Sequence, residues 1–146
     1  MTVVYEVRMP DGVAARTDGV DIWVDDRLND VQRKCAIEHE LEHISRGHST
    51  VQTEDVEMSV RFEVAKKLLP LDAIVGVCKK GKSLKMIARD LGVTRQVLMD
   101  RAATLTDAQA EIAGCLDCRL CPVISARYPK RDTADEYKEH RHFQPA

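Results

Sequence analysis

Hydrophobic and polar positions alternate in short runs over the first part of the chain. The segments 3–7 (VVYEV) and 21–24 (DIWV) are rich in β-branched and aromatic residues, which favour strands. Turn residues lie around them at 10–12 (PDG) and 18–19 (DG). The pattern predicts a short β-sheet over residues 1–27. Its strands are either scaffold alone or include an edge strand that pairs with an extended peptide.

Apolar residues then recur at helical spacing in two longer segments. The first is predicted to be a helix from about Asn29, which can cap it, to about Arg46. The second runs from about Thr53 to Leu69, with Thr53 as its cap and acidic residues in its first turn. Pro70 closes this helix. The N-terminal half of the chain is therefore predicted to be a sheet followed by two helices.

Shorter helical patterns fill the C-terminal half. A third helix is expected at about residues 71–79. Residues 83–105 are typical of a helix–turn–helix, with Ser83 and Thr94 as caps and Gly92 at the turn. The predicted fold class is α+β: a short N-terminal β-sheet packed on two helices, followed by a helical, helix–turn–helix-like C-terminal part.

The composition suits a small folded protein. Of its 146 residues, 44% are hydrophobic and 32% are charged, which fits one compact domain or one domain with a small appendage. The formal net charge of −2 indicates no general attraction to nucleic acid or membrane. Aromatic residues make up 4% of the chain, which argues against a stacking platform for single-stranded nucleic acid.

The N-terminal segment and the cysteines favour a cytoplasmic location. The chain begins without a basic region followed by an apolar stretch, and no apolar run approaches the roughly 20 residues that span a bilayer. The five cysteines are an odd number, and three of them are crowded into CLDCRLC. This usage argues against a secreted disulfide framework. Reduced thiols and no membrane partner are therefore expected.

The strongest chemical signal is the HExxH motif of residues 39–43 (HELEH), inside the first predicted helix. Side chains four residues apart lie on one face of a helix, about 6 Å from each other. Two imidazoles at that spacing can ligate one zinc ion, at Zn–N distances of about 2.0–2.1 Å. Chance alone produces the motif in roughly a few of a thousand chains of this length. The motif predicts one catalytic Zn²⁺ with His39 and His43 as ligands.

Glu40 is the predicted catalytic residue. It is turned by about 100° around the helix from His39, so it can reach a water molecule beside the metal without being a ligand. It can act as general base and then as general acid toward a leaving amine. The alternative is a histidine pair on a solvated helix face. That alternative is disfavoured by apolar neighbours expected to bury the helix: Ala36, Ile37, Leu41 and Ile44.

A carboxylate of the second predicted helix should supply the third ligand, because a hydrolytic zinc site keeps its fourth position open. The candidates are Glu54, Asp55, Glu57 and Glu63. The helix also carries an apolar stripe, formed by Val56, Val60, Val64 and Leu68. Glu57 lies about 40° from the centre of this stripe and Glu63 about 80° from it. A carboxylate on a buried stripe needs a partner, so Glu57 is the predicted ligand and Glu63 the second choice. Alternatively, Glu57 is only a charge favoured at a helix N-terminus.

His48 is not expected to be a ligand. It follows His43 by five residues, whereas the metzincin pattern puts its third histidine six residues beyond the second. It is placed in the loop after the helix.

These residues resemble the ImmA/IrrE-type metallopeptidases of bacteria, phages and mobile elements. The resemblance rests on IEHELEHI, on the VEMSVRFEVAKKLLP that follows and on the DIWVDDRL that precedes it, and covers roughly residues 1–105. It implies a zinc-dependent endopeptidase with a zincin-like (gluzincin) core in which Glu57 is a ligand. The implied partner is a protein substrate, often a helix–turn–helix repressor of a phage or mobile element. The sequence departs from the family pattern in two ways: Glu42 stands where a small residue is common, and Val60 and Arg61 replace alanine and asparagine.

The helix–turn–helix-like region is basic. Residues 79–105 hold seven cationic and two acidic side chains, for a net charge of +5. The cationic residues are Lys79, Lys80, Lys82, Lys85, Arg89, Arg95 and Arg101, and the acidic residues are Asp90 and Asp100. These helices either contact DNA, through the residues 94–96 that open the second helix, or they complete the peptidase fold or grip its protein substrate. The alternative function is accordingly a non-catalytic DNA- or protein-binding regulator.

Three regions follow from these patterns: a zincin-like metallopeptidase core over 1–78, a helix–turn–helix-like region over 79–110, and a cysteine-rich segment with a tail over 111–146. The cluster CLDCRLC is either a second metal site completed by His140 or His142, or a set of free thiols. Its cysteines are Cys115, Cys118 and Cys121. The other two cysteines, Cys35 and Cys78, are expected to be buried apolar residues.

Overall fold

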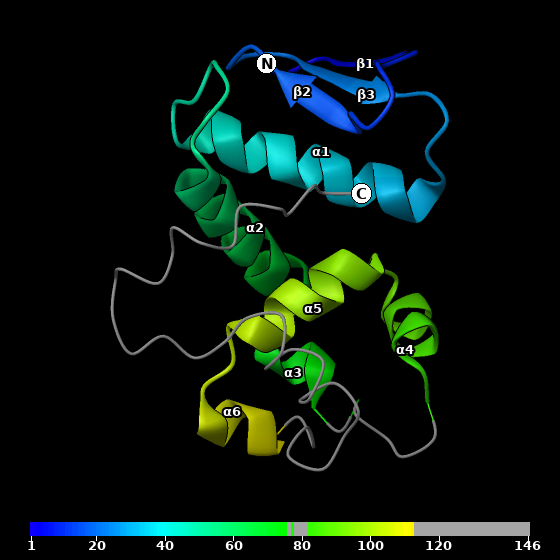
Figure 1. Ribbon diagram of the computed structural model, residues 1–146, viewed down its shortest axis with the longest axis vertical. Helices are drawn as coiled ribbons and strands as arrows, with labels where there is room; N and C mark the ends of the chain where they lie inside the picture. The colour runs from blue at the N-terminus through cyan, green and yellow to red at the C-terminus, as the bar shows by residue number, and fades with distance from the viewer. Residues whose placement is uncertain (76, 78–81, 113–146) are drawn as a thin grey trace.

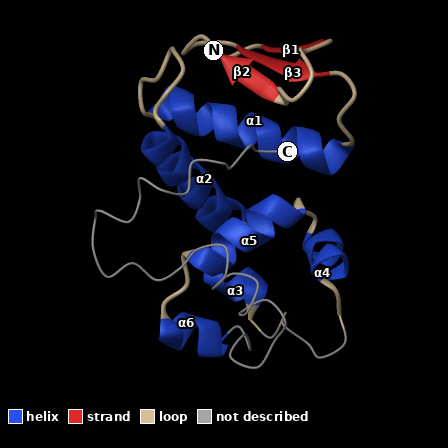
Figure 2. Ribbon diagram, viewed as in Figure 1, coloured by secondary structure: helices blue, strands red, loops and turns tan. Residues whose placement is uncertain are grey.

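The computed structural model describes residues 1–75, 77 and 82–112. Within these ranges the chain forms three strands at one end and six helices, so the predicted α+β class is confirmed. One long helix, α1 (Asp30–Ser45), crosses beneath the sheet (Figure 1). The remaining helices lie on the side of α1 away from the strands (Figure 2).

The sheet consists of β1 (Val4–Val7), β3 (Ile22–Asp25) and β2 (Ala15–Thr17), in that order. β1 runs parallel to β3, and β2 runs antiparallel to it. Ile22 and Val24 are fully buried, and β2 and β3 both pack on α1. The strands at 3–7 and 21–24 were predicted. β2 was not, because its short Ala-Arg-Thr sequence has no strand pattern and pairing with β3 holds it.

The turn after β2 brings the sheet to the C-terminal end of α1. Gly19 has a φ of +96°, and a Cβ at this position would lie 3.0 Å from Cβ of Ser49. Glycine is therefore required here both by the backbone conformation and by the close approach of the loop that follows α1.

Helix α1 has the predicted bounds. The side chain of Asn29 accepts a hydrogen bond from the backbone N–H of Gln32, and the Gln32 side chain accepts one from Asn29, which is a capping box. The expectation about its burial was partly wrong, since Leu41 is 37% exposed. The buried residues of the helix are Cys35, Glu40, Glu42 and His43. Two of the buried polar side chains meet partners on the next helix: Glu42 pairs with Lys67, and His43 with Glu57.

That next helix, α2 (Glu54–Leu68), begins after Thr53, whose side chain accepts a hydrogen bond from Val56, as predicted. Val60 and Val64 of the predicted stripe are buried. The following helix, α3 (Leu71–Ile74), is shorter than the predicted 71–79. It ends because Val75 leaves helical geometry with a ψ of 123°, and the residues next in the chain, Gly76 and Val77, are poor helix formers.

The C-terminal helices are α4 (Leu84–Leu91), α5 (Arg95–Ala103) and α6 (Asp107–Ile112). Ser83 and Thr94 cap α4 and α5, and Gly92 ends α4, all as predicted. α6 was not predicted; Thr106 begins it by accepting a hydrogen bond from the backbone N–H of Gln109. Whether α4 and α5 act as a DNA-binding helix–turn–helix stays a prediction.

One hydrophobic core joins the two halves of the chain. It includes side chains from α1 to α5: Cys35, Ala65, Leu69, Ile74, Ile87, Ala88, Val93, Val97 and Leu98. Cys35 is buried and free, as expected. Residues of both predicted regions, 1–78 and 79–110, contribute to this core.

A buried ion pair fastens α5 to α2. Arg61 donates to both carboxylate oxygens of Asp100, at 2.6 and 3.1 Å, and Gln96 donates to Asp100 at 2.9 Å. The side chains of Arg61 and Asp100 are only 10% and 3% exposed. Next to them, Arg101 donates to the carbonyl of Leu69 at 2.6 Å.

Asp100→Ala is expected to lower the free energy of unfolding by about 3–5 kcal/mol, because it leaves a buried guanidinium without its carboxylate. The double variant Arg61→Met/Asp100→Leu should lose much less, since neither charge of the pair then remains. Urea unfolding followed by circular dichroism measures both. An equal loss in the single and double variants would contradict this explanation.

Candidate metal centre

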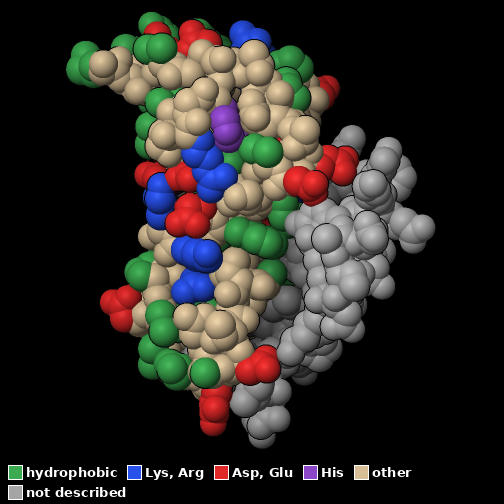
Figure 3. Space-filling view, turned by 90° about the vertical axis from the view of Figure 1, so that its left-hand side faces the viewer, with side chains coloured by type: hydrophobic (Ala, Val, Ile, Leu, Met, Phe, Trp, Pro, Cys, Tyr) green, Lys and Arg blue, Asp and Glu red, His purple; other side chains and the backbone are tan. Residues whose placement is uncertain are grey.

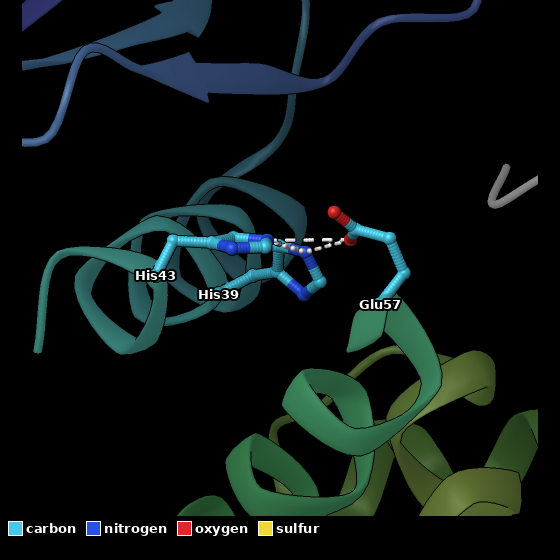
Figure 4. A group of neighbouring side chains, drawn as sticks. All are labelled: His39, His43 and Glu57. Carbon is cyan, nitrogen blue, oxygen red and sulfur yellow. Dashed lines mark hydrogen bonds and ion pairs between the residues drawn. The ribbon is translucent and has the colours of Figure 1, made fainter. Parts of the chain in front are cut away.

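Three side chains converge between α1 and the first turns of α2. His39 and His43 extend from one face of α1 toward Glu57 (Figure 4). Nε2 of His39 lies 3.1 Å from Oε2 of Glu57, and Nε2 of His43 lies 3.2 Å from the same oxygen. The two Nε2 atoms lie 3.1 Å apart. The structure thus brings together the three residues predicted to be ligands, as a cluster that could hold a metal ion.

The spacing of these atoms fits one small cation better than a hydrogen-bond network. The three atoms form a nearly equilateral triangle. A proton on one of them that points at the second atom is therefore about 60° away from the direction of the third, too far for a hydrogen bond to it. Hydrogen bonds therefore cannot satisfy all three contacts. Ligand atoms about 2.0–2.1 Å from a tetrahedral metal ion lie roughly 3.3 Å from each other. The observed triangle is close to one face of such a tetrahedron.

The electrostatics of the cluster follow from these contacts. Burial alone would raise the pKa of Glu57, but hydrogen bonds with His39 and His43 outweigh it and lower the pKa to about 2. In return, the hydrogen bond with Glu57 raises the pKa of His43 above its ordinary value, against the effect of burial. Glu57 is therefore ionised over the physiological range, as a metal ligand must be.

In the metal-free protein, Glu57→Gln is expected to lower the pKa of His43, because the substitution removes the negative charge that stabilises the imidazolium. NMR titration of the His43 ring protons measures the change. Glu63→Gln, on the same helix, is the matched control and should leave the titration of His43 where it was. A His43 pKa that does not fall in the first variant would contradict the contact.

Glu40 lies beside the triangle on α1 and is 8% exposed. Burial raises the pKa of its carboxyl, the two histidines lower it, and Glu57 raises it. These interactions place its charge near all three candidate ligands. A carboxylate with a raised pKa, next to the ligands, is suited to accept a proton and to return it.

The cluster is open on one side. The side chain of His43 is 7% exposed, whereas those of His39 and Glu57 are 25% and 37% exposed. A molecule from solution would therefore approach across His39 and Glu57 rather than His43.

Glu42 and Arg61, two of the positions that differ from the ImmA/IrrE-type pattern, both form ion pairs that hold α2 in place. Glu42 is buried and pairs with Arg46, whose Nε lies 2.7 Å from Oε1, and with Lys67 of α2. Arg46 also donates to Oγ of Ser59 at 2.9 Å. Arg61 reaches Asp100, as described above. Positively and negatively charged side chains are mixed on the face of the molecule that Figure 3 shows. Sequence reasoning missed these partners, because the burial of an ion pair has no local signal.

The other candidates lie outside the cluster. Glu63 is 44% exposed and faces Lys66, 3.7 Å away. Glu54 and Asp55 are exposed. His48 lies in the loop after α1, as predicted, and its Nδ1 is 3.0 Å from the Nδ1 of His43, the ring nitrogen that faces away from the cluster. The predicted site of Cys115, Cys118 and Cys121 lies outside the described residues, as do His140 and His142, either of which was expected to complete it. Cys78, expected to be buried, also lies outside them.

Among the helices of the described ranges, none combines the length and the apolar character needed to cross a bilayer. The chain matches no known family profile, no curated protein and no solved structure.

Proposed function

We propose that this chain is a zinc-dependent endopeptidase. The observation that carries the proposal is the triangle of two imidazole nitrogens and one carboxylate oxygen, with sides of 3.1, 3.1 and 3.2 Å, beside a buried fourth residue, Glu40. Two histidines and a glutamate are a ligand set used by catalytic zinc, and they leave one position open. The resemblance to the ImmA/IrrE-type metallopeptidases supports the same conclusion.

Each residue has a distinct role in this proposal. His39, His43 and Glu57 would hold the zinc ion, which when bound polarises a carbonyl group and makes water more acidic. Glu40 takes the proton from the water molecule that attacks the scissile carbonyl. It then gives that proton to the amine nitrogen that leaves. The raised pKa of Glu40 supports both transfers, because the group must be a base first and an acid afterwards.

The edge of the sheet favours the proposal that the substrate is a protein. β2 is an edge strand that packs on α1, and the turn after it touches the loop that follows α1. In the part of the chain that the structure describes, no strand pairs with the outer edge of β2, and the turn that follows β2 lies near the C-terminal end of α1. An extended peptide that adds to this edge would gain main-chain hydrogen bonds. From the family resemblance, we propose that the substrate is a repressor or regulator of a phage or mobile element, cleaved in the cytoplasm.

The alternative is a non-catalytic regulator that binds DNA through α5. Base contacts would have to come from the exposed side chains of that helix, and Arg95 is its one exposed residue. Arg101 and Asp100 are buried, and Lys82 pairs with Asp90 at 2.8 Å. Part of the basic set in the sequence is therefore engaged within the protein. These contacts favour the reading in which α4 and α5 complete the peptidase fold.

The proposed function is tested by metal removal and reconstitution. The full chain, stripped with a chelator and dialysed, is incubated with helix–turn–helix repressors and with denatured casein. Addition of one equivalent of Zn²⁺ should restore cleavage, and Mg²⁺ should not, because a site with two histidines selects the softer ion. A chain that takes up no zinc under these conditions would contradict the proposal.

A further inference from the structure

We propose that His48 is a positioning residue for His43: it accepts a hydrogen bond from the His43 Nδ1–H and so fixes the tautomer that leaves Nε2 free to bind a metal ion. This inference rests on the proposed zinc site. It concerns the orientation of a ligand and assigns no further ligand.

The end of α1 explains why His48 is there. Gly47 has a φ of +74°, the left-handed conformation that glycine adopts at little cost. The N–H of Gly47 donates to the carbonyl of Ile44 at 3.0 Å, and the N–H of His48 donates to the carbonyl of His43 at 2.9 Å. This pair of bonds is the Schellman motif, in which the second residue after the cap folds back over the last turn. The motif commonly brings two apolar side chains together, and here it brings together two imidazoles.

The contact between the rings is a hydrogen bond through a single proton. The Nδ1 atoms lie 3.0 Å apart, and the ring planes are inclined by 54° with centroids 5.2 Å apart. Two unprotonated nitrogens would repel at this distance, and so would two N–H groups. One ring must therefore donate and the other accept.

The direction of the hydrogen bond follows from the metal site. Nε2 of His43 faces His39 and Glu57, so it must carry a lone pair to bind a cation. A neutral imidazole has one N–H, which then belongs to Nδ1 of His43. Nδ1 of His48 is the acceptor. His43 is buried, with a side chain 7% exposed, so a protein partner in this position replaces the water that an exposed ring would use.

Two substitutions of His48 separate hydrogen bonding from volume. His48→Phe keeps a ring but removes the acceptor. His48→Asn places a carbonyl oxygen two bonds from Cβ, where the Nδ1 of histidine lies, and keeps the acceptor. Loss of such a partner typically costs about 10–100-fold in metal affinity. His48→Phe should therefore weaken zinc binding by about that factor, and His48→Asn should bind zinc nearly as tightly as the wild type.

The readouts are the zinc dissociation constant, from competition with a chromophoric chelator, and the visible spectrum of the Co²⁺-substituted protein. Ser49→Ala, an exposed neighbour, is the control and should change neither. Thermal unfolding of each metal-free variant checks that it folds, and His48→Ala replaces His48→Phe if that variant does not. The Co²⁺ spectrum should shift in the variants without an acceptor and return in His48→Asn.

Two outcomes overturn the proposal. Zinc affinity that is unchanged in His48→Phe, or reduced equally in His48→Phe and His48→Asn, shows that His48 does not act as an acceptor. In both cases wild-type zinc binding persists, so the proposed function still stands. A wild-type chain that binds no zinc overturns the proposed function and this inference together.

Discussion

Glu40→Gln is expected to leave the zinc content near one ion per chain while lowering the rate of peptide hydrolysis by about 10²–10⁴-fold, the usual contribution of a general acid–base residue. The variant keeps the size and burial of the side chain, so the cluster of His39, His43 and Glu57 should keep its geometry. It removes the carboxylate that accepts a proton from water. Zinc content by atomic emission and cleavage of a co-expressed repressor measure the two effects.

The matched control is Glu38→Gln, two residues earlier on the same helix and outside the HExxH motif. It removes the same charge from α1 and should leave turnover close to that of the wild type. If Glu40→Gln cleaves at the wild-type rate, Glu40 is not the base. If it abolishes zinc binding as well, its effect on turnover is indirect.

Glu57→Ala is expected to weaken zinc binding by about 100-fold. Zinc sites with four protein ligands bind with roughly 10–16 kcal/mol at neutral pH, or about 3 kcal/mol for each ligand. Each 1.4 kcal/mol corresponds to about a tenfold change in affinity. Competition with a chelator measures the dissociation constant of the purified variant, which should remain folded, because Glu57 is partly exposed.

Glu63→Ala is the control for this measurement. Glu63 is on the same helix and was the second candidate from the sequence, but it faces Lys66 in the structure. It should bind zinc as the wild type does. The opposite result, with Glu63→Ala losing zinc and Glu57→Ala retaining it, would assign the third ligand to the other face of α2.

Local signals predicted much of this fold. Asn29, Thr53, Ser83 and Thr94 each begin a helix with the side-chain hydrogen bond that their residue type suggests. The angular position of Glu57 relative to the stripe of α2 predicted which carboxylate would meet the histidines. These features depend on residues close in sequence, and their physics is local.

Features that depend on distant partners were not predicted. β2 is a strand because its backbone pairs with β3; its three residues have no strand pattern of their own. The burial of Glu42 depends on Lys67, and that of Asp100 on Arg61. A charged side chain in a helical pattern is read as solvent-facing until its partner is known.

The placement of α2 has a practical consequence for anyone who shortens this protein to the smallest piece that carries the proposed metal site. Helix α2 carries Glu57 near its N-terminal end. One turn further on, its Arg61 forms the buried ion pair with Asp100 of α5. Cutting the chain at residue 78 would remove Asp100, and with it the ion pair, together with Ile87, Val97 and Leu98 of the shared core. The shortened piece would retain every proposed ligand but would lack these contacts, which hold α2 and its Glu57 in position. The smallest fragment that keeps the proposed ligands in place should therefore extend through α5.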